Sequence, residues 1–163
     1  MSKSLLMLVA PLFAVTAAPA PAAILGSDAP ACLSGKPSMV VRVSGFKKPS
    51  GTVKLAVYGA QGYLAKGGKL RKVVVPVRST SPMDICIAVP NAGQYAVAVH
   101  HDLNANGNKD ASDGGGYSGN PKLSITNLKP SFGKTAVQVG RAPRHVAVML
   151  QYRRGLSIAP VNG

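Results

Sequence analysis

A run of oxygen-bearing side chains between residues 102 and 113 has the composition of a cation-binding loop. Its spacing, D-x-N-x-N-G-x5-D, follows that of EF-hand calcium loops, in which oxygens come from positions 1, 3, 5, 7, 9 and 12 and a glycine at position 6 makes the turn. Gly107 stands at that turn position. The predicted ligands are the side chains of Asp102, Asn104, Asn106, Asp110 and Asp113 and the backbone carbonyl of Asn108.

The composition of the chain makes this run unusual. The 163 residues include 19 Lys and Arg but only 5 acidic residues, all Asp, and three of these five lie in the run. Calcium prefers oxygen ligands, and extracellular modules bind it with dissociation constants of roughly 10⁻⁴–10⁻³ M. We therefore expect weak calcium binding. The alternative is an ion-free Asn/Gly turn whose side chains bond their own backbone, because Asp113 is shorter than the usual closing Glu.

Three histidines raise a second possibility, a metal-dependent hydrolase. His100 and His101 precede the loop, and His145 lies further along the chain. The sequence contains no H-E-x-x-H or G-x-S-x-G motif, and it lacks an acid/base pair at a useful spacing. We therefore expect a non-catalytic protein in which His101 ends a strand and orients the loop.

Short segments with alternating apolar and polar residues must position this loop. They are separated by Gly-, Pro- and Asn-rich turns, a pattern that predicts about seven strands in an all-β, antiparallel sandwich or small barrel. The predicted domain spans residues 38–152. The predicted strands are Met39–Ser44, Thr52–Tyr58, Leu70–Val77, Met83–Val89, Gln94–His101, Lys134–Val139 and His145–Tyr152.

The two ends of the chain differ from this domain. Lys3, an apolar run from Leu5 to Val15 and a stretch of small residues predict a signal peptide over residues 1–22, with cleavage after Ala22. A membrane anchor is the alternative, but the run is short for a span. Residues 23–37 read as a loose lead-in, and residues 153–163 as a disordered tail. The protein is thus expected to be exported, to the periplasm or the medium.

Two cysteines, Cys32 and Cys86, follow the predicted signal peptide. Because an exported protein meets an oxidising compartment, an even cysteine count predicts a disulfide between them. Two free buried thiols are the alternative. The chain has no C-x-x-C motif, so redox catalysis is not expected.

The net charge of +14 favours contact with anionic surfaces. The basic residues are spread along the chain without interleaved aromatics, so a specific nucleic-acid site is not expected. Non-specific attraction to an anionic cell envelope fits the charge better.

Several segments resemble one protein family. The stretch from Gly93 to Gly107, GQYAVAVHHDLNANG, is similar to the signature of domain-of-unknown-function family 2141, a Gly-x-Tyr-Ala-Val strand that runs into His-Asp-x-Asn-x-Asn-Gly. Weaker similarities are Gly51–Tyr58, Gly116–Asn120 (with Gly119 where Asn is usual) and Pro130–Phe132. The resemblance, over roughly residues 39–150, implies an exported bacterial sandwich of immunoglobulin or transthyretin type, without an established activity.

Together these features predict an exported, non-catalytic binding module. The calcium loop would present a recognition surface for a protein or glycan ligand, flanked by His101, Tyr117, Ser118, Asn120 and Phe132. A purely structural envelope protein with an ion-free loop is the alternative, and the hydrolase is the third possibility.

Overall fold

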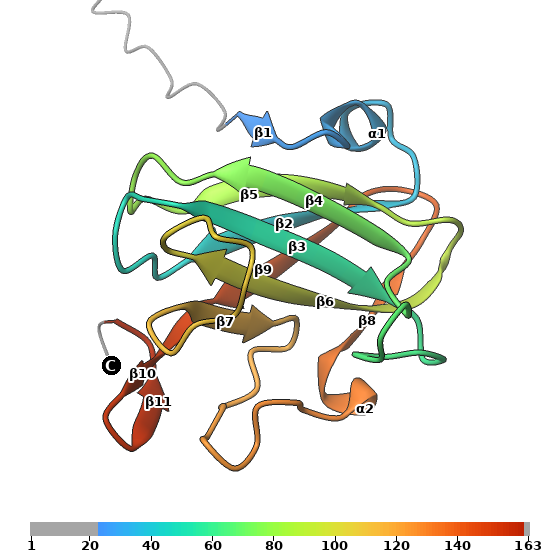
Figure 1. Ribbon diagram of the computed structural model, residues 1–163. Coiled ribbons are helices and arrows are strands. Elements are labelled where there is room, and N and C mark those ends of the chain that lie inside the picture. Colours follow the sequence, from blue (N-terminus) through green and yellow to red (C-terminus); the bar gives the residue numbers. More distant parts are fainter. Residues whose placement is uncertain (1–22, 162–163) are drawn as a thin grey trace, which may run out of the picture.

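The computed structural model describes residues 23–161, so the predicted signal peptide at residues 1–22 lies outside the described residues. Within the described residues, eleven strands and two short helices follow one another (Figure 1). Their bounds are β1 Ile24–Leu25, α1 Ala29–Leu33, β2 Ser38–Ser44, β3 Thr52–Tyr58, β4 Arg71–Pro76, β5 Met83–Ala88, β6 Gly93–Asp102, β7 Gly114–Tyr117, α2 Phe132–Thr135, β8 Ala136–Val139, β9 Arg144–Met149, β10 Gln151–Arg154 and β11 Ser157–Ala159.

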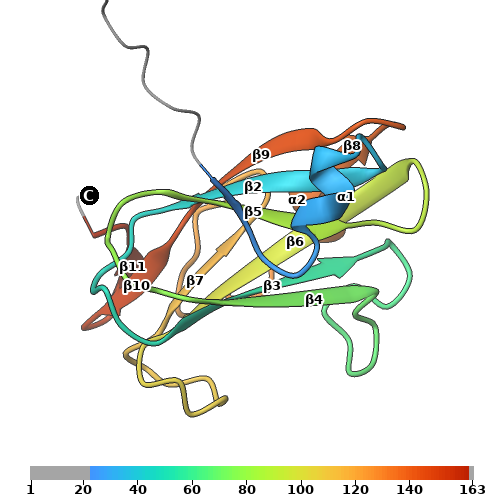
Figure 2. The same cartoon turned by 90° about the horizontal axis from the view of Figure 1, so that it is seen from above.

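The strands form two sheets that pack face to face, so the predicted all-β sandwich is confirmed. The smaller sheet has the order β1-β5-β2-β9, and the larger one the order β11-β10-β7-β6-β3-β4, with β8 also paired to β6. Figure 2 shows the two layers from above. The sandwich is not wholly antiparallel, because β1 pairs with β5 and β2 with β9 in parallel. The chain can reach these parallel positions because long connections separate each pair.

Six of the predicted strands correspond closely to β2, β3, β4, β5, β6 and β8, although the first two residues of the 134–139 segment belong to α2. The seventh, His145–Tyr152, is divided. Its first part is β9 in the smaller sheet and its second part is β10 in the larger one. The division falls at Leu150, which is fully buried and whose N–H donates to the carbonyl of Ser44. One apolar run thus serves both layers.

Val, Leu and Ile side chains from alternate strand positions fill the space between the sheets. Val41, Val43 and Ile85 come from the smaller sheet, and Leu55 and Val97 from the larger, all at 0% exposure. Because side chains alternate between the two faces of a strand, the residues between them point outward. This alternation leaves the outer face of the larger sheet free to carry polar groups.

The segment predicted as a loose lead-in is instead ordered. β1 pairs with β5, and α1, with Pro30 in its first turn, packs on β5. Arg71 donates to the buried carboxylate of Asp28 (Nε–Oδ2 2.8 Å), which lowers the pKa of Asp28 despite its burial. The predicted disulfide is present, Cys32–Cys86, with the two Cα atoms 6.1 Å apart. A pattern of neighbouring residues in the sequence cannot reveal such long-range contacts. For this reason the segment was predicted to be loose although it is ordered.

The C-terminal segment, predicted as a disordered tail, also differs. β10 and β11 form a hairpin through residue 159, with Tyr152 opposite Ala159. β10 also pairs with β7 on its other side. The C-terminal segment has no strand pattern in its own sequence, and its strands form because they pair with the larger sheet. In residues 23–161, no helix has the length and apolarity needed to cross a membrane.

Candidate functional site

The predicted calcium loop connects β6 to β7, and Asp102 lies buried at its base. Lys54 on the neighbouring β3 reaches it, with Nζ 2.6 Å from Oδ2, and the N–H of Gly107 donates to the same oxygen at 2.9 Å. The bond to Lys54 lowers the pKa of Asp102 against the opposing effect of burial. The other oxygen, Oδ1, is buried and has no hydrogen-bond partner among the described residues.

The tip of the loop is held by its own side chains. The amide groups of Asn104 and Asn106 both donate to Oδ2 of Asp110, each at 2.9 Å. The amide oxygens of the same two residues accept the N–H groups of Asn106 and Asn108 at 3.1 and 2.8 Å. These are the side-chain-to-backbone bonds of Asx turns. The sequence-predicted ligands at positions 3, 5 and 9 are therefore brought together.

Asp113 closes the loop. Its Oδ2 lies 2.9 Å from Nε2 of His100 and accepts the N–H of Asp110 at 3.0 Å, and its Oδ1 accepts the N–H of Leu103 at 3.1 Å. Burial opposes ionisation of Asp113, but these donors outweigh it and lower its pKa. Asp113 thus ties both ends of the loop to β6.

The side-chain oxygens of the loop belong to carboxylate and amide groups. These are the ligands that a hard cation such as calcium prefers. In residues 23–161, however, no three His, Cys, Asp or Glu side chains are grouped closely enough to hold a metal. Lys54 and His100 supply the positive partners of Asp102 and Asp113 instead. Calcium would have to share or displace these partners.

His101 is fully buried and not part of a binding surface. Its Nε2 lies 2.9 Å from the carbonyl of Ser50, and its Nδ1 lies 2.6 Å from the hydroxyl of Tyr152. A carbonyl only accepts, so Nε2 must carry the proton, and Nδ1 then accepts from Tyr152. Tyr152 Oη in turn accepts the N–H of Lys47 at 3.1 Å. Burial lowers the pKa of His101 and favours this neutral form.

The other residues of the predicted recognition surface have mixed positions. Ser118 is buried, and its Oγ bonds Val97 and Thr135. Asn120 is exposed, but its amide bonds the backbone of Ala147 and Met149. Both therefore serve the connection after β7.

Tyr117 and Phe132 remain partly exposed. The hydroxyl of Tyr117 donates to the carbonyl of Leu128 at 2.9 Å, and burial raises the pKa of Tyr117 to about 12. Phe132 packs edge-on against Tyr63 with ring centroids 5.4 Å apart. Tyr117 is the last residue of β7, and Phe132 is the first residue of α2.

The histidines of the hydrolase alternative do not come together. His100 and His101 lie on β6 in the larger sheet, and neighbouring strand residues point to opposite faces. His145 lies on β9 in the smaller sheet, where it is exposed.

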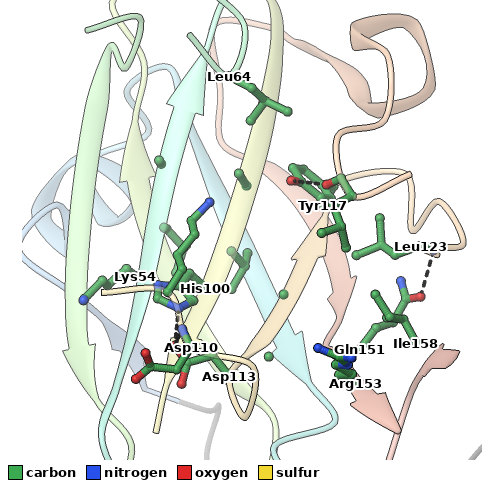
Figure 3. A pocket seen from close by; sticks show the side chains of 18 of the residues that line it. Lys54, Leu64, His100, Asp110, Asp113, Tyr117, Leu123, Gln151, Arg153 and Ile158 are labelled. Carbon is green, nitrogen blue, oxygen red and sulfur yellow. Dashed lines mark hydrogen bonds and ion pairs between the residues drawn. The ribbon is translucent and has the colours of Figure 1, made fainter. Parts of the chain in front are cut away.

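A hollow on the outer face of the larger sheet was not predicted from the sequence. We call it the outer-face trough. It has a volume of about 540 Å³ and lies next to the loop, with Lys54, His100, Asp110 and Asp113 at one end (Figure 3). Its floor consists of small residues on adjacent strands, so only the strand register reveals it. The alternation of Ala with Val in β6 and the single Ala56 in β3 are the local sequence features that correspond to this floor.

A comparison with protein families identifies a matching family model. A family model described as "Uncharacterized protein conserved in bacteria (DUF2141)" matches residues 41–147. The matched stretch runs from β2 to β9 and includes the whole loop. No curated protein and no solved structure matches the chain.

Proposed function

Because the chain belongs to this uncharacterized bacterial family, DUF2141, we propose a function from its own residues: an exported, non-catalytic binding module whose loop at residues 102–113 takes up calcium weakly. The observation that carries the proposal is the buried carboxylate of Asp102, whose Oδ1 lacks a partner among the described residues at the base of an Asp- and Asn-rich loop. A buried acceptor without a partner is costly and is a plausible ligand for a cation.

Export is supported by two features. The disulfide Cys32–Cys86 is the kind of bond that persists outside the cytoplasm, and the first 22 residues have the charge and apolar pattern of a signal peptide. The non-catalytic role is supported by the separation of His100 and His145 into different sheets.

A specific contact favours the ion-free alternative. Nζ of Lys54 already lies 2.6 Å from Asp102, so an internal cation can serve where calcium would. Under this alternative, the loop is a structural turn closed by the protein's own charges.

Thermal unfolding in calcium separates the two possibilities. An ion that binds only the folded state stabilises it by RT ln(1 + [L]/Kd), so about 10 mM calcium with a Kd of about 1 mM would contribute about 1.4 kcal/mol and raise the Tm by about 5 °C. We expect this rise in calcium and its reversal by a chelator. An Asp110→Asn variant should lose most of it, and an Asp84→Asn variant, changed outside the loop, should keep it.

A Lys54→Met variant sharpens the test. Removal of the lysine leaves the Asp102 carboxylate buried without its cation, so we expect a lower Tm without calcium. If the loop binds calcium, the ion should restore much of that loss and bind more tightly than in the wild type. If calcium left the Tm of Lys54→Met unchanged, the calcium proposal would be wrong and the ion-free alternative would stand.

A further inference from the structure

The floor of the outer-face trough is built from small side chains on three adjacent strands. Ala56 on β3 pairs with Ala98 on β6, and Gly115 on β7 pairs with His100 on β6. The alternate residues, such as Leu55, point into the core. Small residues in these neighbouring rows leave the sheet surface uncovered at its centre, where larger side chains would fill it.

The walls of the trough are largely apolar at one end. Leu64 comes from the β3–β4 connection, Leu123 from the β7–α2 connection and Ile158 from β11, and Figure 3 shows them with Tyr117 around the side away from Asp110. Leu128, from the same connection as Leu123, also lines the trough and is 52% exposed. This exposed apolar surface is suited to an apolar ligand group.

The rim is positively charged. Five Lys and Arg side chains line the trough against two carboxylates, those of Asp110 and Asp113. The carboxylate of Asp110 accepts hydrogen bonds from the side-chain amides of Asn104 and Asn106, and that of Asp113 is hydrogen-bonded to His100. The chain's other three carboxylates bond Arg71, Arg42 and Lys54. Within residues 23–161, none of four rim cations, which are Lys69, Lys72, Lys109 and Arg153, forms an ion pair with a carboxylate.

We propose that the outer-face trough binds a small amphipathic anion, a carboxylate or similar single anionic group on an apolar body. The cationic rim attracts the anionic group, and the Ala/Gly floor with its leucine walls covers the apolar body. The volume of about 540 Å³ lies within the range of small-molecule sites. This inference names a ligand class for the binding role proposed above and rests on that role, but it does not require calcium.

The shape of the outer-face trough favours a free molecule as the ligand over a membrane surface. The trough is recessed between two chain connections and the β10–β11 hairpin, so a ligand must enter it, whereas a bilayer would meet only its rim. The experiment therefore uses decanoate monomers as the probe and vesicles of phosphatidylglycerol as a separate arm.

Titration of the full-length mature protein with decanoate, followed by amide chemical shifts, tests the proposal. We expect saturable shifts at Ala56, Ala98 and Gly115, in chelator as well as in calcium. Decyltrimethylammonium, with the same tail and the opposite charge, and butyrate, with the same charge and a short tail, should bind at least about tenfold more weakly. Equal binding of the cationic probe, shifts located elsewhere, or binding to vesicles alone would overturn the proposal.

Two variants locate the determinants. Lys72→Glu should weaken decanoate binding about fivefold by reversing a rim charge, and Lys36→Glu, the same change at an exposed lysine outside the trough, should not. Ala98→Leu should fill the floor and weaken binding at least about tenfold, with the unliganded melt showing that the variant is folded. If Lys72→Glu and Lys36→Glu behaved alike and Ala98→Leu still bound decanoate, the trough would not be the site. Thermal unfolding in calcium tests the loop proposal separately. A failure of the decanoate proposal can therefore be distinguished from a failure of the loop proposal.

Discussion

Each of the five carboxylates in this basic chain is engaged by a hydrogen-bond donor of its own, and four of them by a Lys, Arg or His side chain. The fully buried His101 is organised in the same way. His101, Tyr152, Ser50 and Lys47 form one chain of hydrogen bonds that ties the β2–β3 turn to β6 and β10. Buried polar groups are stable only when satisfied, so we expect this relay of hydrogen bonds to stabilise the fold.

Removal of the Tyr152 hydroxyl tests the relay. Tyr152→Phe leaves Nδ1 of buried His101 without a donor and the N–H of Lys47 without an acceptor, so we expect a loss of about 1–3 kcal/mol in the free energy of unfolding. Tyr95→Phe, which removes a single bond to the carbonyl of Asn91, should cost less, about 1 kcal/mol. Urea denaturation of both variants makes the comparison. Equal losses would contradict the relay.

At the scale of elements, β7 depends on its glycines. β7 lies between β6 and β10 in the larger sheet, and its glycines are approached by the side chains of Tyr152 on β10 and Val148 on β9. A Cβ at Gly114 would overlap the ring of Tyr152, whereas a Cβ at Gly115 would meet only the carbonyl of Val99 at 3.9 Å. Two neighbouring glycines therefore have different roles, one in close packing and one on the trough floor.

The pair of variants Gly114→Ala and Gly115→Ala separates these roles. Because Tyr152 is fully packed and held by hydrogen bonds, Gly114→Ala should destabilise the fold by about 1–3 kcal/mol or more. Gly115→Ala should change stability by less than about 1 kcal/mol. Midpoints of chemical denaturation give both values, and a harmless Gly114→Ala would show that β10 does not pack on β7 as described.

The whole molecule is a sandwich whose smaller sheet is completed by the segment before β2. The disulfide ties α1 to β5 across 54 residues, and the Asp28–Arg71 ion pair extends the same segment to β4 in the other sheet. The N-terminal segment therefore covers one side of the sandwich and connects its two layers.

Loss of the disulfide should show as a large change in stability. Closure of a loop of this length contributes about 4 kcal/mol in the chain-entropy model, so we expect a Cys32→Ala/Cys86→Ala double variant to lose about that much. A reductant should lower the Tm of the wild type and leave the double variant unchanged. A wild-type melt that is insensitive to reductant under conditions that reduce the bond would contradict this assignment of stability.

Much of the fold was predictable because its signals are local. Alternation in β3, β4 and β9 marks one core-facing side and one side that is more exposed, a property that each strand carries in its own residues. The Asp/Asn/Gly spacing likewise identified the loop whose members contact one another. The hairpin β10–β11 and the segment before β2 were missed because both are ordered by partners far along the chain.

The candidate site likewise has some features that were predictable from the local sequence and others that were not. The one-dimensional pattern was sufficient to place Asp102, Asp110 and Asp113 in one turn, since loop residues close in sequence are close in space. It could not show that Lys54, 48 residues away, pairs with Asp102. The trough likewise arises only where strand register places Ala56 beside Ala98 and His100 beside Gly115. Strand pairing brings distant residues together and decides which side of each strand meets water, and both depend on the folded sheet.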